Sequence, residues 1–276
     1  MRRATSGGLT RAWLLFGVVA AVTFCVGPFV WQALTSLRPE GELTRVGLPS
    51  SLSLASYEGA FRGRPFGRVL LNSLGVASAT TALSLAIGAP AAFALAKLPL
   101  PGRRILLGGA LAISMFPPIA TVSPLFLVLR ALGLHDELGG LVLPYTTFAL
   151  PMTLWILSGF FRDLPDELYR AALVDGCSPL QALRRVLLPL AAPGIAATAI
   201  LVFIFAYNEL LYALTFTSSP EKRTVPVAIS LFAAEHAEPW GEIAAASIIA
   251  TLPLVVVTLL FQRKIVAGLT AGGVKE

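Results

Sequence analysis

Long runs of apolar residues, separated by short polar segments, dominate the pattern along the chain. A helix needs about 20 apolar residues to cross the hydrocarbon of a bilayer. Six runs predict such helices, at about 12–34, 69–96, 105–129, 141–161, 188–213 and 243–261. An even number of spans places both termini on one side. We therefore expect an all-α integral membrane protein in which residues 1–276 form a single membrane-spanning domain.

Proline and glycine occur inside several of these runs, where they would break a helix in water. In a membrane bundle, neighbouring helices can satisfy the backbone groups that such residues free. We expect them to mark kinks beside a cavity. The positions are Gly27-Pro28, Gly88 and Pro90, Pro117-Pro118, Pro144, Pro151 and Pro193.

The polar interruption at 163–189 carries the start and stop signals of a short helix. Pro165 suits a first helical position, because its missing N–H would be unpaired there anyway. Asp166 and Glu167 then fall in the first turn, where the helix dipole favours anions. Gly176 is a natural end, since a left-handed cap is unstrained only without a Cβ.

A second short helix is predicted directly afterwards. Ser178 and Gln181 have the spacing of a capping box, with Pro179 between them at the first helical position. Apolar residues then recur at helical spacing, at Leu180, Leu183 and Leu187. The simplest interpretation is an ordinary surface helix in a loop. Ala171 and Ala172 favour more than that, because small side chains let another protein's backbone approach closely.

The 163–189 segment resembles the coupling loop of ABC importer membrane subunits, whose motif is E-A-A-x3-G-x9-I-x-L-P. The matching residues are Ala171, Ala172, Gly176, Leu188 and Pro189, with Val186 in the isoleucine place. Arg170 replaces the glutamate that opens the motif. The resemblance implies that these residues, with Glu167, Arg170 and Asp175, couple the chain to an ATPase. In the helix, Glu167 lies three residues before Arg170 and could supply the missing acidic contact. Arg170 could then pair with Glu167 or with an acid on the partner, or point to lipid phosphates.

Other stretches are similar to the sugar-importing subfamily, the maltose-transporter-like permeases. They are 208–212, Leu252-Pro253 and 268–272, and the tail at 263–270 is also similar to actinobacterial trehalose permeases. The resemblance implies the type I permease fold of ABC importers, with a cytoplasmic coupling helix. It also implies that the chain is no enzyme and binds no cofactor, and that it imports a di- or oligosaccharide, with trehalose as a candidate.

The resemblance implies several partners. They are a second permease, which completes a heterodimer, two ATP-binding subunits that hold ATP and Mg, and an extracytoplasmic sugar-binding protein. A bacterial cytoplasmic membrane is the expected location.

Composition and charge agree with a membrane protein. The chain is 56% hydrophobic and 13% charged, whereas soluble domains are about 25% charged. The net charge of +6 does not indicate nucleic-acid binding, since the charges are scattered between apolar runs. With the N-terminus inside, thirteen of the 21 Lys and Arg residues fall in inner segments. The positive-inside rule therefore places both termini and the 163–189 segment in the cytoplasm.

The sequence offers little catalytic chemistry. It contains no G-x-x-x-x-G-K-[ST] phosphate loop, so we do not expect ATP binding by that route. His135 and His236 lack companions at metal-ligand spacing, and no metal site is predicted.

Glu209 is the one acid near a predicted membrane span. Ionisable groups within the bilayer are functional suspects, although Glu209 could also be hydrated near the outer end of its helix. A sugar needs amide, hydroxyl and aromatic partners, so we expect a solute path lined by Asn72, Tyr207, Asn208, Glu209 and Tyr212. Asn72 could instead join two helices by hydrogen bonds.

The segments 35–67 and 214–242 are predicted to be long polar connections on the outer side. Such loops are plausible docking surfaces, and Glu235, His236 and Glu238 are the predicted contacts with the binding protein.

Three alternatives to a sugar importer remain. They are a proton-coupled secondary transporter that uses Glu209, an ABC permease for a non-sugar solute, and a membrane scaffold that transports nothing. Whether uptake needs ATP and survives collapse of the proton gradient distinguishes the first of these from an ABC importer.

Overall fold

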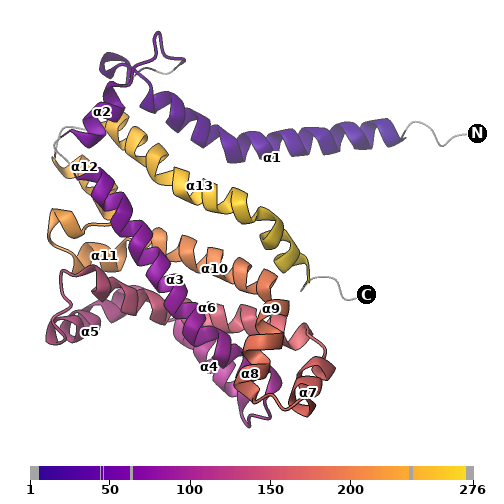
Figure 1. Ribbon diagram of the computed structural model, residues 1–276. Helices are drawn as coiled ribbons and strands as arrows, with labels where there is room; N and C mark the ends of the chain where they lie inside the picture. The colour runs from indigo at the N-terminus through magenta and orange to yellow at the C-terminus, as the bar shows by residue number, and fades with distance from the viewer. Residues whose placement is uncertain (1–5, 44, 46, 63–64, 236–238, 272–276) are drawn as a thin grey trace, which may run out of the picture. The chain divides into compact units, whose positions relative to one another are not determined.

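The structure is a computed structural model that describes residues 6–43, 45, 47–62, 65–235 and 239–271. Every regular element within those residues is helical (Figure 1). Four helices are long and apolar enough to cross a membrane, namely α1 (Ser6–Ser36), α3 (Phe66–Lys97), α6 (Leu138–Asp163) and α13 (Trp240–Ala271). The predicted all-α membrane fold is confirmed.

The predicted run at 105–129 is not one straight helix. It consists of α4 (Arg103–Ser114) and α5 (Pro118–Ala131), which meet at an angle of 92°. Pro117 and Pro118 occupy the start of α5, and neither can donate a backbone hydrogen bond to the turn before it. The helix therefore ends and restarts at these prolines.

The predicted run at 188–213 is also interrupted. One arm combines α8 (Pro179–Ala182), the π-helical turn η2 (Leu183–Leu187) and α9 (Leu188–Leu190). It meets α10 (Ala192–Tyr207) at 82°. The run then ends at Tyr207, and α11 (Leu211–Phe216) is a separate short helix. If each bent pair counts as one span, the described residues contain up to six.

The chain divides into two units, of which the first contains residues 1–64 and 231–251. It holds α1, the 3-10 turn η1 (Glu40–Glu42), α2 (Ala55–Phe61) and the beginning of α13. The hydroxyls of Ser36 and Tyr57 are hydrogen-bonded at 2.8 Å, which ties α1 to α2. A Cβ built on Gly241 would lie 2.4 Å from Ser56 Oγ, so glycine permits the close approach of α13 to α2.

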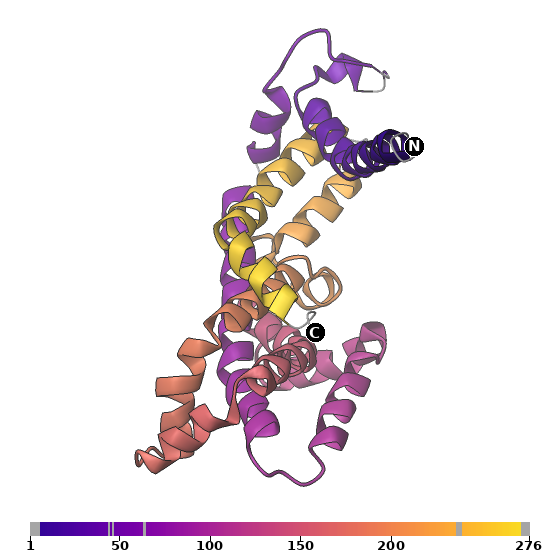
Figure 2. The same cartoon turned by 90° about the vertical axis from the view of Figure 1, so that its right-hand side faces the viewer.

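The second unit contains residues 65–230 and 252–276. Its centre is formed by α3, α6 and α10, which lie side by side (Figures 1 and 2). Glycines allow the close packing, because a Cβ on Gly88 would lie 2.4 Å from Thr153 Cγ2 and one on Gly194 would lie 2.4 Å from the Phe160 ring. The short helix α7 (Asp166–Val174) follows α6 at one end of this bundle.

The described part of the segment 214–242 contains more helix than a polar loop would. It contains the 3-10 turn η3 (Pro220–Lys222) and the apolar helix α12 (Val225–Glu235). Val225 and Val227 are buried. Because α12 has only 11 residues, its apolar stretch is too short to predict a membrane span. The sequence analysis therefore predicted a polar connection here and no helix.

Candidate functional site

The helix α7 has the predicted start and stop, with one shift. Pro165 lies just before the helix instead of at its first position, and Asp166 and Glu167 occupy the first turn. Gly176 adopts a left-handed φ of 84°. Its N–H donates to the Leu173 carbonyl at 3.1 Å, and the Cys177 N–H donates to the Ala172 carbonyl at 3.0 Å. These two bonds form a Schellman motif, which fixes the end of α7.

The second predicted helix begins with the expected capping box. The Gln181 N–H donates to Ser178 Oγ at 3.3 Å, and the Ser178 N–H donates to Gln181 Oε1 at 2.8 Å. The helix continues as a π-helical turn up to Leu187 and ends before Ala191. Pro189 cannot donate a backbone hydrogen bond, which agrees with the irregular helix around it.

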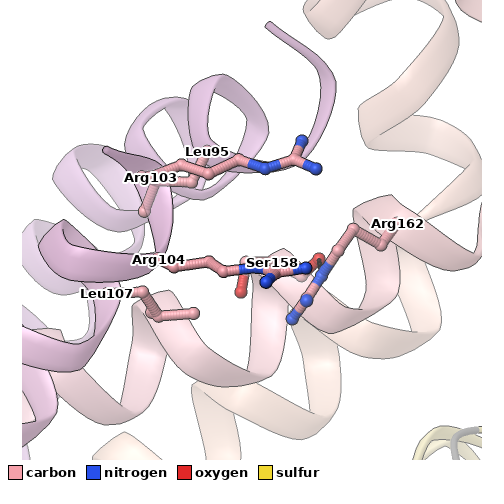
Figure 3. Close-up of a pocket in the computed structure, with 6 residues that line it drawn as sticks. All are labelled: Leu95, Arg103, Arg104, Leu107, Ser158 and Arg162. Carbon is pink, nitrogen blue, oxygen red and sulfur yellow. Dashed lines mark hydrogen bonds between the residues drawn. The ribbon is translucent and has the colours of Figure 1, made fainter. Parts of the chain in front are cut away.

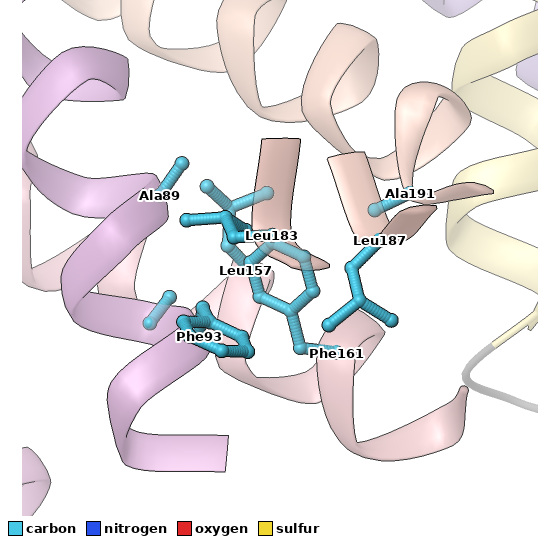
Figure 4. Packing of buried hydrophobic residues seen from close by; sticks show 8 residues of the cluster. Ala89, Phe93, Leu157, Phe161, Leu183, Leu187 and Ala191 are labelled. Atoms are coloured by element: carbon cyan, nitrogen blue, oxygen red, sulfur yellow. The ribbon is translucent and has the colours of Figure 1, made fainter. Parts of the chain in front are cut away.

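An apolar cluster holds the 163–189 segment against the bundle (Figure 4). The cluster takes Ala89, Ala92 and Phe93 from α3, Leu157 and Phe161 from α6, Leu183 and Leu187 from the arm before α10, and Ala191 from the bend between that arm and α10. The Phe93 ring packs edge-on against Phe161 at 6.2 Å and against Tyr169 of α7 at 5.6 Å. The segment is therefore an extension of the packed core, and α7 is attached to α3.

Lys97 adds a polar attachment at the end of α3. Its Nζ donates to Asp166 Oδ1 at 2.6 Å and to the Leu164 carbonyl at 2.5 Å. The Lys97 side chain is only 2% exposed. The hydrogen bond from Lys97, and then its charge, lower the pKa of Asp166 below the usual 3.8. Sequence reasoning missed this pair because the partners lie 69 positions apart; the only signal was a lone Lys at the end of an apolar run.

Four of the residues that are predicted to couple the chain to an ATPase are exposed on α7 and its C-cap. Glu167, Arg170, Ala171 and Asp175 are exposed, and Val174 is 87% exposed. No ion pair joins Glu167 to Arg170 among the residues that the structure describes. The contact of Arg170 with an acid on the partner stays a prediction.

The two motif alanines differ in their surroundings. Ala172 is only 4% exposed and packs within the chain, whereas Ala171 is exposed. Of the two last motif residues, Leu188 packs against the apolar cluster and Pro189 is exposed. The segment thus separates an inward, packing set of residues from an outward set that is free to contact a partner.

Glu209 caps the short helix α11. Its carboxylate accepts hydrogen bonds from the Tyr212 N–H at 3.0 Å and the Ala213 N–H at 3.3 Å. These N–H groups have no partner within the helix, so the acid fixes the break after α10. The neighbouring Asn208 is exposed, and its amide donates to the Ile204 carbonyl at 2.8 Å.

Aromatic residues surround this cap. Tyr212 is buried, and its hydroxyl is 2.7 Å from Thr121 Oγ1. The Tyr145 hydroxyl is buried near Glu209 but makes no hydrogen bond of normal geometry within the described part of the chain. Tyr207 is buried and stacks on Phe203 at 5.9 Å. Sequence reasoning missed Tyr145, which lies within an apolar run.

Asn72, the fifth residue of the predicted solute path, forms hydrogen bonds away from the turn at Glu209. Its amide nitrogen donates to the carbonyls of Glu221 at 2.7 Å and Arg223 at 3.0 Å. It therefore joins α3 to the connection around η3.

Of the three predicted contacts with the binding protein, Glu235 ends α12, while His236 and Glu238 lie outside the described residues.

One charged connection on the same side as α11 was not predicted. Asp136 has a left-handed φ of 57°, and its carboxylate accepts from the N–H groups of Ser218 at 2.7 Å and Ser219 at 3.0 Å. Lys222 also pairs with Glu137. The hydrogen bonds, first that of the Ser219 hydroxyl, lower the pKa of Asp136 to about 2.

Residues 84–270 match the family described as binding-protein-dependent transport system inner membrane component. This match covers most of the chain and includes the whole 163–189 segment. The chain belongs to this family. The 163–189 segment, the four long helices and the two bent helix pairs of the described residues are therefore parts of a transport permease.

Named relatives cover nearly the full length of the permease. It is 48% identical to the trehalose transport system permease protein SugB of Mycobacterium tuberculosis, over 92% of this chain and 94% of that protein. It is 40% identical to the trehalose/maltose transport system permease protein MalG of Thermococcus litoralis, over 97% and 98%. It is also 40% identical to the sulfoquinovosyl glycerol transport system permease protein SmoH of Agrobacterium fabrum, over 99% and 98%.

A solved structure shows the same fold. The chain matches a crystal structure of a bacterial ABC transporter involved in the import of the acidic polysaccharide alginate, with a TM-score of 0.76. The alignment covers 95% of this chain and 99% of that chain at 22% identity. The permease therefore has the ABC importer permease fold that the sequence motif implied.

Proposed function

We propose that the permease is the membrane-spanning subunit of an ATP-driven ABC importer that carries a sugar into the cytoplasm. The observation that carries this proposal is the structured 163–189 segment, which packs on α3 and α6 and keeps the outer face of α7 free. Relatives named for trehalose, maltose and a sulfoquinovosyl glycerol support a glycoside substrate. Trehalose is our first candidate, because the 48% identical relative is named for it.

The assembly would contain four kinds of subunit. A second permease completes the pathway, two ATP-binding subunits hold ATP and Mg, and an extracytoplasmic protein delivers the sugar. The exposed face of α7 contacts an ATP-binding subunit through Ala171, Val174 and the charged residues beside them. When hydrolysis moves that subunit, α7 passes the movement to α3 through Phe93 and Lys97.

The residues at the turn between α10 and α11 are our candidates for the solute path. Asn208 offers an exposed amide, and Glu209 and Tyr212 shape the turn beside it. Tyr207 supports the turn from within the core. Asn72 uses its amide on two backbone carbonyls, so we assign it to shaping the outer end of the path instead of binding solute.

Uptake into proteoliposomes that contain the assembled transporter tests the proposal. Labelled trehalose, maltose and sulfoquinovosyl glycerol are compared with ATP enclosed, with ATP omitted and with a protonophore added. Uptake should need ATP and survive the protonophore. Of the three sugars, unlabelled trehalose should inhibit the uptake of the labelled sugars most strongly. Uptake that follows the proton gradient without ATP would establish the secondary transporter. No uptake of any glycoside, with full uptake of another solute, would overturn the sugar assignment.

The orientation has its own test. Cys177 in the 163–189 segment and a cysteine introduced at Ser218 are labelled from each side of sealed vesicles. The positive-inside rule predicts reaction from opposite sides, with Cys177 accessible from the cytoplasm. Reaction of both from the same side would contradict the predicted topology.

A further inference from the structure

A small pocket opens where α4 begins and α6 ends (Figure 3). Its volume is about 100 Å³, which is more than one water molecule needs. The lining residues are Leu95, Arg103, Arg104, Leu107, Ser158 and Arg162. The side chains of Arg103 and Arg104 reach from α4 towards α6, where Ser158 and Arg162 lie. Three guanidinium groups from two helices therefore meet around one cavity.

These three positive charges are not neutralised by the protein. Among the described residues, Arg103, Arg104 and Arg162 form no ion pair. Arg162 donates from Nε to the Ser158 carbonyl at 3.1 Å, which fixes its side chain and leaves its terminal nitrogens unbonded. The first turn of α4 contains no acid, although a helix start favours anions. The pocket is thus suited to an anion that the chain itself does not supply.

The surface beside the pocket is apolar. On α4, Ile105 is 80% exposed, Leu106 is 58% exposed and Ile113 is 60% exposed. Trp155 is 57% exposed, and the spacing of Trp155, Ser158 and Arg162 places them along one face of α6. Tryptophan is enriched at membrane interfaces, where its ring bridges headgroups and hydrocarbon. A ligand that fits both surfaces has an anionic head and an apolar tail.

We propose that this pocket binds the phosphate of an anionic phospholipid, with the acyl chains along the exposed face of α4. Arginine suits this role, because its planar fork binds phosphate oxygens in pairs. Basic pockets between helices on the cytoplasmic side of membrane proteins bind such headgroups. The site requires only that these helix ends lie at a membrane surface, so it is independent of the transported solute.

The pocket lies beside the start of the 163–189 segment. Arg162 is in the last turn of α6, and the Leu164 carbonyl two residues later accepts the hydrogen bond from Lys97. A lipid phosphate on Arg162 would therefore hold the end of α6 to the start of α4. This position gives the membrane a direct contact with the helix that leads into α7.

Native mass spectrometry of the assembled transporter tests the site. The complex is released from nanodiscs that contain phosphatidylglycerol or phosphatidylcholine, and retained lipid is counted for wild type, Arg104→Gln, Arg162→Gln and the double variant. Each lost arginine should lower phosphatidylglycerol retention about fivefold. Arg184→Gln, an exposed arginine outside the pocket, is the matched control for charge and should retain as much lipid as wild type.

Several results would overturn the proposal. Equal retention of phosphatidylglycerol by wild type and the double variant would do so, as would equal retention of phosphatidylcholine and phosphatidylglycerol by wild type. Arg162→Lys keeps the charge and should retain more lipid than Arg162→Gln, which separates lost binding from failed folding. The last measurement is the binding of inorganic phosphate to wild type and to the double variant. If phosphate binds to wild type, is lost in the double variant and no lipid is retained, the site takes free phosphate and the lipid assignment is wrong.

Discussion

The Lys97 ammonium lies 2.6 Å from the Asp166 carboxylate, with its side chain almost wholly buried. This pair joins the last residue of α3 to the first residue of α7. The same ammonium donates to the Leu164 carbonyl, so it fixes both the connection and the helix that follows it. Movement of α7 without movement of α3 would break the bond between Lys97 and Asp166.

Asp166→Asn should weaken coupling between ATP hydrolysis and uptake. It keeps an oxygen acceptor but leaves the buried Lys97 charge without an anionic partner, and an unpaired buried charge is unfavourable. Uptake per ATP hydrolysed should fall. Lys97→Met with Asp166→Asn removes both charges and should impair stability less than Asp166→Asn alone. If Asp166→Asn couples as well as wild type, the pair has no part in transmission.

Gly176→Val should destabilise the 163–189 segment by about 1–2 kcal/mol, because a Cβ strains the left-handed backbone. A Cβ at Gly176 meets no atom within 4 Å, so backbone strain is the only cause. Gly176→Asn is the matched control, since asparagine tolerates this conformation. Pull-down of the ATP-binding subunits should fail for valine and succeed for asparagine. Equal pull-down for both would remove the claim that the cap is needed.

Ala171→Leu and Ala172→Leu should have different defects, one in binding the ATP-binding subunits and the other in the stability of the permease. Ala172 is buried, so a larger side chain there should destabilise the permease itself by about 1–3 kcal/mol. Ala171 is exposed, so its leucine variant should keep the thermal stability of wild type and lose the ATP-binding subunits. Thermal unfolding and pull-down in parallel separate the two. Loss of stability in Ala171→Leu would show that it also packs within the chain.

The hydrogen bonds from the Ser218 and Ser219 N–H groups to Asp136, which we call the Asp136 latch, should weaken at low pH. The pKa of Asp136 is about 2 in the folded chain, below the usual 3.8. A depressed pKa means that its stabilising contribution is present above pH 3.8 and is lost as the pH falls towards 2. Hydrogen exchange at the Ser218 and Ser219 amides should therefore accelerate over that range.

Asp136→Gly is the matched variant for this latch. Glycine keeps the left-handed backbone but removes the carboxylate. Its exchange at Ser218 and Ser219 should be fast at every pH. Slow exchange in this variant would show that other contacts protect these amides.

Glu209→Gln should reduce uptake while the complex still assembles. Glutamine keeps an oxygen acceptor for the Tyr212 N–H, whereas Glu209→Ala removes the cap and should destabilise α11 by about 1 kcal/mol. Neither effect should change with an imposed proton gradient. A Glu209→Gln defect that appears only under a gradient would instead support proton coupling.

Local signals in the sequence were sufficient for several features. The capping box at Ser178 and the left-handed cap at Gly176 each depend on neighbouring residues. The long apolar runs likewise predict α3 and α6 within three residues at each end, whereas α1 begins six residues before its run and α13 ends ten residues after its run. The Pro117-Pro118 pair also marks the break between α4 and α5. In contrast, the break at Asn208 depends on how the helix ends pack, which a hydropathy pattern does not contain.

Features that join distant segments could not be predicted. The Lys97–Asp166 pair, the Asp136 latch and the contact of Tyr145 with the α11 turn each link residues far apart in the chain. The two motif alanines also could not be distinguished from the sequence, because only the packing shows that Ala172 is buried and Ala171 is exposed. The family motif marks both alanines alike, whereas the packing distinguishes them.

The sharp bend at Ala191 has a geometric consequence for the opposite end of α10. This helix has 16 residues, which makes it about 24 Å long. If the helix turns as a rod about Ala191, a rotation of about 10° displaces Tyr207 by about 4 Å. Asn208 and Glu209 follow Tyr207 directly. A tilt that barely disturbs the packing around Leu187 would thus widen or narrow the turn at Glu209 by more than the length of a hydrogen bond.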